Sequence, residues 1–136
     1  MIDCRCVLST CPYCGTGCGL HLQVLDGRLI GTQPAKNHLI SEGGLCIKGW
    51  NAHDFVEHED RLRTPMIRKN GKLVEAGWDE ALTLVAEKLG AIKAESGPDS
   101  IALLASAKCT NEENYVLQKF ARAVVGTNNI DHCARL

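Results

Sequence analysis

Four cysteines have the residue type and the spacing of a metal-binding site. Cys11, Cys14 and Cys18 are separated by two and three residues, and Cys46 follows after 27 further residues. Thiolates ligate both zinc and iron–sulfur clusters. Three of them in one short loop, joined by a fourth from a distant loop, can close around a single inorganic centre.

The arrangement of the ligands favours a [4Fe–4S] cluster over zinc. Zinc ribbons usually pair two well-separated C-x2-C knuckles, whereas here the division is three plus one and Pro12 stands beside a ligand. Three glycines alternate through the same loop: Gly15, Gly17 and Gly19. They permit positive φ angles and a close approach of the backbone, and their N–H groups can donate to cluster sulfurs. A zinc-stabilised interaction module remains an alternative, as does a free-standing ferredoxin-like electron carrier.

Bulk composition restricts the remaining function classes. The chain has 136 residues, eight cysteines and a formal net charge of −1. The charge argues against nucleic-acid binding, which needs a cationic surplus. The N-terminus shows no export signal and no apolar stretch reaches about 18 residues. We therefore expect a cytoplasmic location without a membrane span, where thiols stay reduced and a disulfide scaffold is unfavourable.

The N-terminal part, residues 1–63, is predicted to be a small β-rich module wrapped around the cysteines. Residues 20–24 alternate apolar and polar side chains as a half-buried strand does. Asp26 and Gly27 form a strong hairpin turn before a returning strand at 28–30. Residues 31–44 are predicted to be a loop that brings Cys46 back to the other three cysteines.

Residues 64–136 are predicted to begin a layered α/β domain that is incomplete in this chain. We expect a hairpin at 66–74, a helix at 79–95 that ends at Gly97, a strand at 100–106 buried on both faces, and a helix at 111–125 capped by Thr110 and Glu113. A further strand or loop would start at Ile130. The two helices each carry an apolar stripe expected to be buried, formed by Leu82, Val85, Leu89 and Ile92 and by Val116, Leu117, Phe120 and Val124. The fold class is α/β.

The sequence resembles a known family at several of its motifs. Residues 11–19, Cys-Pro-Tyr-Cys-Gly-Thr-Gly-Cys-Gly, and residues 45–49, Leu-Cys-Ile-Lys-Gly, are similar to the N-terminal Fe–S domain of molybdopterin oxidoreductases. The likeness continues through residues 62–68 and 78–81. Residues 114–115, 118–123 and 126–129 resemble the catalytic subunit of formate dehydrogenases in particular.

This resemblance implies an enzyme that interconverts formate and CO2 on molybdenum or tungsten held by two molybdopterin guanine dinucleotides. It implies that electrons leave through the [4Fe–4S] cluster of Cys11, Cys14, Cys18 and Cys46. Lys48 would be the electron conduit between cluster and pterin. Arg135 is expected near the pterin. The electron partner would be a ferredoxin-like, hydrogenase or NAD-reducing subunit.

In the family, the segment similar to residues 131–136 is followed at once by a selenocysteine or cysteine that ligates the metal. We therefore expect no catalytic ligand within this chain, an inactive 136-residue fragment, and the metal ligand at position 137. Our hypothesis is that a UGA codon encodes selenocysteine there, and sequencing past the Leu136 codon tests it. By this alignment Cys133 is not the metal ligand.

Four cysteines lie outside the predicted ligand set. Cys4 and Cys6 are interpreted as incidental thiols near a frayed terminus, with the alternative that a partner subunit's clusters dock there. Cys109 and Cys133 are expected to behave as small buried apolar residues, with Cys133 and His132 near the active-site metal of the complete fold.

Overall fold

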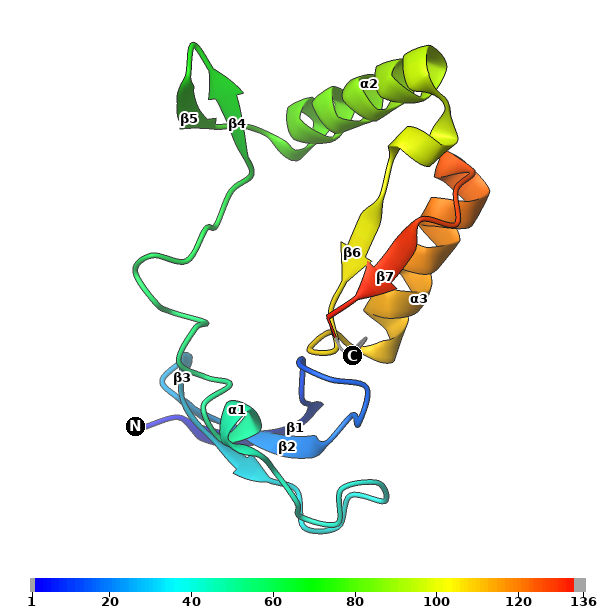
Figure 1. Cartoon of the computed structure of the whole chain (residues 1–136). Coiled ribbons are helices and arrows are strands. Elements are labelled where there is room, and N and C mark those ends of the chain that lie inside the picture. The colour runs from blue at the N-terminus through cyan, green and yellow to red at the C-terminus, as the bar shows by residue number, and fades with distance from the viewer. Residues whose placement is uncertain (1, 134–136) are drawn as a thin grey trace. The chain divides into compact units, whose positions relative to one another are not determined.

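The computed structural model of the chain describes residues 2–133 (Figure 1). These residues form two compact units. The first contains the described residues up to Arg61 together with Ala105–Tyr115 and His132–Cys133, and the second contains Leu62–Leu104 and Val116–Asp131. Arg135, predicted near the pterin, lies outside the described residues.

An antiparallel sheet of three strands organises the first unit (Figure 1). Its order is β1 (Cys4–Thr10), β2 (Gly19–Leu25) and β3 (Arg28–Pro34). Asp26 and Gly27 both have positive φ, 48° and 81°, as a two-residue hairpin turn requires. The predicted hairpin of β2 and β3 is therefore confirmed, but β3 extends to Pro34, so residues 31–34, predicted as loop, belong to the strand.

Strand β1 was not expected, and it overturns the picture of a frayed terminus around Cys4 and Cys6. Both cysteines lie within β1, whose residues pair in register with β2 from Cys4 opposite Leu25 to Thr10 opposite Gly19. Six of its seven residues are exposed. Because neither face of the strand is buried, its sequence carries no apolar alternation, and only the backbone pairing with β2 defines it.

The core of the first unit is small and lies against the cysteine loops. Cys11, Leu20 and Ala52 are buried together, and Leu20 is completely inaccessible to solvent. Four partly buried side chains pack on them: Tyr13, Cys18, Leu22 and Leu45. The core therefore draws on both cysteine-bearing segments.

The second unit begins with a hairpin and a long helix, both close to their predicted bounds. Strands β4 (Met66–Lys69) and β5 (Lys72–Glu75) meet at a turn in which Asn70 and Gly71 have φ of 50° and 80°. Helix α2 (Trp78–Ser96) ends at Gly97, which has a φ of 81°, and a 3-10 turn, η1 (Pro98–Ser100), follows. No helix within residues 2–133 is both long and apolar enough to span a membrane.

The last elements form a β–α–β arrangement. Strand β6 (Leu103–Ala105) pairs with β7 (Ile130–His132), and helix α3 (Asn111–Lys119) with its π-helical continuation η2 (Phe120–Val125) connects them. The two arrows point the same way in Figure 1, as such a crossover requires. The capping box is confirmed: the Thr110 N–H donates to Glu113 Oε2 at 2.7 Å, and the Glu113 N–H donates to Thr110 Oγ1 at 3.3 Å.

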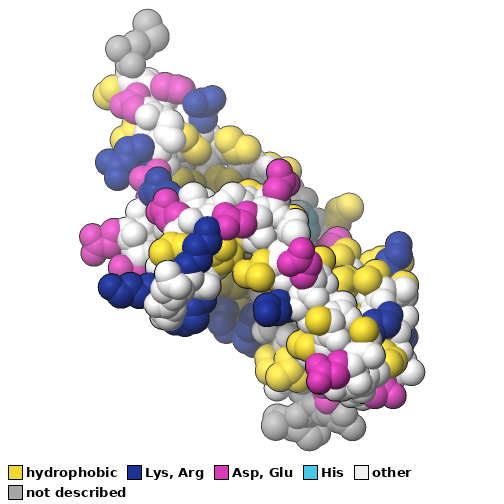
Figure 2. Space-filling model, turned by 90° about the horizontal axis from the view of Figure 1, so that it is seen from above, with side chains coloured by type: hydrophobic (Ala, Val, Ile, Leu, Met, Phe, Trp, Pro, Cys, Tyr) yellow, Lys and Arg dark blue, Asp and Glu magenta, His cyan; other side chains and the backbone are white. Residues whose placement is uncertain are grey.

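The predicted burial of this half is wrong for the described chain. On α2, Leu82 is 58% exposed, and on α3 Val116 is 61% exposed. Leu104, in the strand expected to be buried on both faces, is 82% exposed. A sheet of two strands with one connecting helix cannot cover two faces, so the apolar residues remain at the surface, where Figure 2 shows hydrophobic side chains over several patches.

Candidate metal centre

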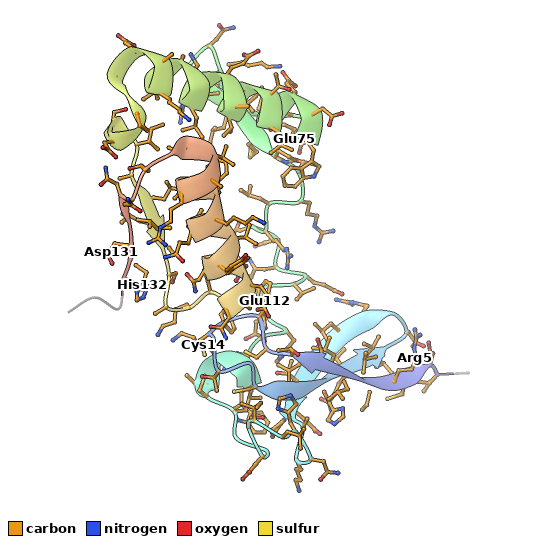
Figure 3. All side chains as sticks on the ribbon, turned by 90° about the vertical axis from the view of Figure 1, so that its right-hand side faces the viewer. Arg5, Cys14, Glu75, Glu112, Asp131 and His132 are labelled. Atoms are coloured by element: carbon orange, nitrogen blue, oxygen red, sulfur yellow. The ribbon has the colours of Figure 1, made fainter. Side chains whose placement is uncertain are left out.

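The loop from β1 to β2 carries three of the four predicted ligands. The Cys11 N–H donates to the Cys18 carbonyl at 2.8 Å, which extends the strand pairing into the loop. Between them the Gly17 N–H donates to the Cys14 carbonyl at 3.2 Å, and Gly17 has a φ of 62°. Cys14 thus lies at one end of the sheet and Arg5, in β1, toward the other (Figure 3).

Two glycines of this loop approach other segments closely and do not have a positive φ. Gly15 faces Asn111, whose Nδ2 donates to the Gly15 carbonyl at 3.0 Å, and an added Cβ would collide with the Asn111 side chain. Gly19 lies against the ring of His38, which leaves no room for a Cβ either. The conformational role predicted for all three glycines therefore holds at Gly17, while Gly15 and Gly19 allow close contact with other segments.

The fourth predicted ligand lies at the start of a single helical turn. Cys46 is the N-cap of α1 (Ile47–Trp50), and its carbonyl accepts the Trp50 N–H at 3.0 Å. The backbone N–H groups of Gly49 and Lys48 lower the pKa of the Cys46 thiol, and the positive charge of Lys48 acts in the same direction. The turn therefore favours the thiolate, the form that ligates metals.

The cysteines of the predicted ligand set influence one another's pKa values. Burial raises the pKa of the Cys18 thiol, and the charges of Cys11, Cys14 and Cys46 raise it further. The hydroxyl and N–H of Thr16 lower the pKa of Cys14. Because thiolates repel each other, a set of four is stable only around a cationic centre, and this donor set fits an iron–sulfur core.

Within residues 2–133 no three His, Cys, Asp or Glu side chains are grouped so that they hold one metal ion. The assignment of Cys11, Cys14, Cys18 and Cys46 as cluster ligands therefore rests on their spacing and on their mutual electrostatic effects. Lys48 is exposed on α1, two residues after Cys46.

The remaining cysteines differ in their surroundings. Cys4 is six residues along β1 from Thr10, about 20 Å at the rise of a strand, so it lies too far away to join the ligand loop. Cys109 is half-buried. Cys133 is exposed, contrary to expectation, and the Ala107 N–H donates to its sulfur at 3.3 Å. This bond, with the Ser106 hydroxyl, lowers the pKa of the Cys133 thiol.

Three residues that support the site were not found from the sequence. Asn111 and His38 contact the glycines of the first loop, and Thr32 joins α1 to β3. An asparagine, a histidine and a threonine have no distinctive spacing from the cysteines, so only the folded chain reveals them.

Comparison with known proteins identifies the two halves. Residues 5–58 match the molybdopterin oxidoreductase Fe4S4 domain and residues 61–136 match molybdopterin oxidoreductase. These matches confirm the predicted 4Fe–4S cluster and molybdopterin as cofactors, and they disfavour the zinc module.

Several known proteins are similar to this chain over most of its length. The alpha subunit of F420-dependent formate dehydrogenase 1 from Methanococcus maripaludis is 60% identical over 93% of this chain and 18% of its own length. Formate dehydrogenase H from Escherichia coli is 48% identical over 96% of this chain and 19% of its own length. The chain thus spans about a fifth of the length of these relatives. Since the family match covers more than half of it, the chain belongs to the molybdopterin oxidoreductase family.

Proposed function

We propose that this chain is the electron-transfer part of a formate dehydrogenase catalytic subunit, with residues 1–63 as the cluster module and 64–136 as the start of the molybdopterin domain. The observation that carries the proposal is the four-cysteine set of a Fe4S4 domain in a chain 60% identical to a formate dehydrogenase alpha subunit. The reaction is HCOO⁻ → CO2 + H⁺ + 2e⁻ or its reverse. The molybdenum or tungsten centre, when bound, supplies the two-electron chemistry.

In this proposal the residues of the chain hold the cluster and stabilise its reduced form. Cys11, Cys14, Cys18 and Cys46 are the ligands. Reduction adds a negative charge to the cluster, and the N–H groups at the start of α1 and the ammonium of Lys48 stabilise that charge. Lys48 is thereby the electron conduit toward the pterin, and Arg135 is a proposed pterin contact.

The electron partner is proposed to be a separate redox subunit, either ferredoxin-like, hydrogenase or NAD-reducing. Because three relatives are named as F420-dependent, an F420-reducing subunit joins these candidates. We place the protein in the cytoplasm, a proposal supported by the eight free thiols, since a reducing compartment keeps cysteines available for metal binding.

The test is anaerobic purification of the full-length subunit. We expect about four irons per chain, molybdenum or tungsten, and formate oxidation coupled to a viologen dye. The 136-residue chain alone is expected to bind the cluster without oxidising formate. One zinc per chain in place of iron, or turnover by the 136-residue chain, contradicts the proposal.

The role of Lys48 has its own test. Lys48→Gln is expected to slow reduction of the cluster by formate and to leave the iron content unchanged. Lys36→Gln, a change on the loop after β3, is the matched control. Formate-dependent cluster reduction that is equally fast in Lys48→Gln and wild type would contradict the conduit.

A further inference from the structure

We propose that Thr32 is a positioning residue for the cluster, because its hydroxyl anchors the helical turn that carries Cys46 and Lys48. The inference rests on the proposed function, in which Cys46 is a ligand and Lys48 the conduit. It concerns a residue that is not among the predicted ligands and lies 14 residues before Cys46 in the sequence.

Thr32 is a buried polar residue in the edge strand β3. Only 5% of the Thr32 surface is exposed to solvent. Its single hydroxyl proton faces two acceptors, the Gly49 carbonyl at 2.9 Å and the Trp50 carbonyl at 2.5 Å, and His53 Nδ1 lies 3.4 Å away. Every polar group near this hydroxyl therefore belongs to α1 or to the turn that follows it.

Helix α1 makes few contacts of its own, although Leu45 and Ala52 on either side of it pack in the core. It has four residues, far fewer than the roughly 12–15 that an isolated helix needs. Its apolar side chains do not fix it either, since Ile47 is 74% and Trp50 44% exposed, and Gly49 is its one buried residue. The Thr32 hydroxyl adds a donor from β3 at the C-terminal end of α1, where the Gly49 carbonyl also accepts the Ala52 N–H at 3.2 Å.

The anchor acts on Cys46 through the backbone of α1. The Thr32 hydroxyl contacts the carbonyls of Gly49 and Trp50, and the Trp50 N–H donates to the Cys46 carbonyl at 3.0 Å. Gly49 also packs so closely against Leu45 that no Cβ would fit. Trp50 thus links the hydroxyl of Thr32 to the backbone of the predicted fourth ligand, and Lys48 lies between Cys46 and Trp50 in the chain.

Removing the hydroxyl takes away the donor that ties the carbonyls of Gly49 and Trp50 to β3, while the Gly49 carbonyl still accepts the Ala52 N–H at 3.2 Å. A methyl group in its place keeps the volume. We expect Thr32→Val to let α1 shift, so that the N–H groups and Lys48 stabilise the reduced cluster less well. The reduction potential of the cluster should fall, and its reduction by formate should slow on the order of fivefold, the equivalent of one hydrogen bond. Thr32→Ser, which retains the hydroxyl, should restore both.

The experiment uses the full-length holoenzyme under anaerobic conditions. The readouts are an EPR-monitored redox titration of the cluster, iron content, and stopped-flow reduction by formate. Thr127→Val is the matched control: Thr127 is 2% exposed and its hydroxyl donates to Asp99 at 2.7 Å, in the second unit. This control should lower stability without moving the potential.

The outcomes separate the possible failures. A Thr32→Val enzyme with wild-type potential and rate overturns the positioning role, and so does a Thr32→Ser enzyme that behaves as Thr32→Val does. If Thr32→Val loses iron entirely, then retention of iron and potential by Thr32→Ser supports the role of the hydroxyl. A wild-type enzyme without a cluster or without formate oxidation refutes the proposed function itself.

Discussion

The first unit, which carries the predicted ligands, and the second unit differ in how much of their apolar surface is buried. In the first, Leu20 is completely buried, and the buried Thr32 hydroxyl lies within hydrogen-bond distance of two carbonyls. In the second, α2 has no buried residue. Both units have regular strands and turns, so local structure forms in either setting. The difference teaches that burial needs a partner surface. The ligand loops pack against Leu20, and Ala121 and Val125 of η2 are also buried, whereas none of the residues of α2 is.

The largest expected effect is loss of the cluster from the first unit. Cys14→Ser in the full-length subunit removes a ligand, and we expect iron to fall below about four per chain and formate-driven electron transfer to be abolished. Iron and sulfide analysis with EPR measures this. Cys109→Ser, at a half-buried cysteine, should retain the cluster. A complete cluster in Cys14→Ser would refute the ligand assignment.

The next largest effect should come from shortening a core side chain, which should destabilise the first unit more than the second. Leu20→Ala is expected to cost about 2–5 kcal/mol of unfolding free energy, because it opens a cavity in the core. Leu82→Ala, at a side chain 58% exposed, should change the stability of the 136-residue chain by less than about 0.5 kcal/mol. Anaerobic chemical denaturation of this chain measures both. Equal losses would show that α2 is covered in solution.

Replacing glycine by alanine should change the stability of the chain in opposite directions in the two units. Gly19→Ala places a methyl group against the His38 ring and should destabilise the chain by about 1–3 kcal/mol. Gly90→Ala, in the middle of α2 with open space around it, should stabilise it by about 0.5–1 kcal/mol. Thermal denaturation under anaerobic conditions compares them. The close packing of the ligand loop is disproved if Gly19→Ala is neutral.

The smallest effect is expected at the start of α3. Thr110→Ala removes the hydroxyl that accepts the Glu113 N–H and should cost about 1 kcal/mol. Thr83→Ala, at an exposed position within α2, is the control for loss of a threonine on a helix. Circular dichroism during denaturation measures both. The cap contributes nothing if the two variants unfold together.

Much of the local structure could be predicted, and the reason is the short range of the signals. The turns at Asp26–Gly27 and Asn70–Gly71 depend on two adjacent residues with positive φ. The capping box of Thr110 and Glu113 spans three residues. The apolar periodicity identified α2, but it could not say which surface would cover it.

By itself the sequence determined the turns and the helix ends, because each depends on residues a few positions apart, and it predicted the ligand set from the spacing of the cysteines. Only the tertiary structure decided how the ligand loops are supported. Asn111 meets Gly15 across 96 residues and Thr32 meets Gly49 across 17. It also decided that Cys4 and Cys6 belong to β1, at a distance from the cysteine loop. Contacts of this kind depend on which surfaces meet after folding, and no local spacing encodes them.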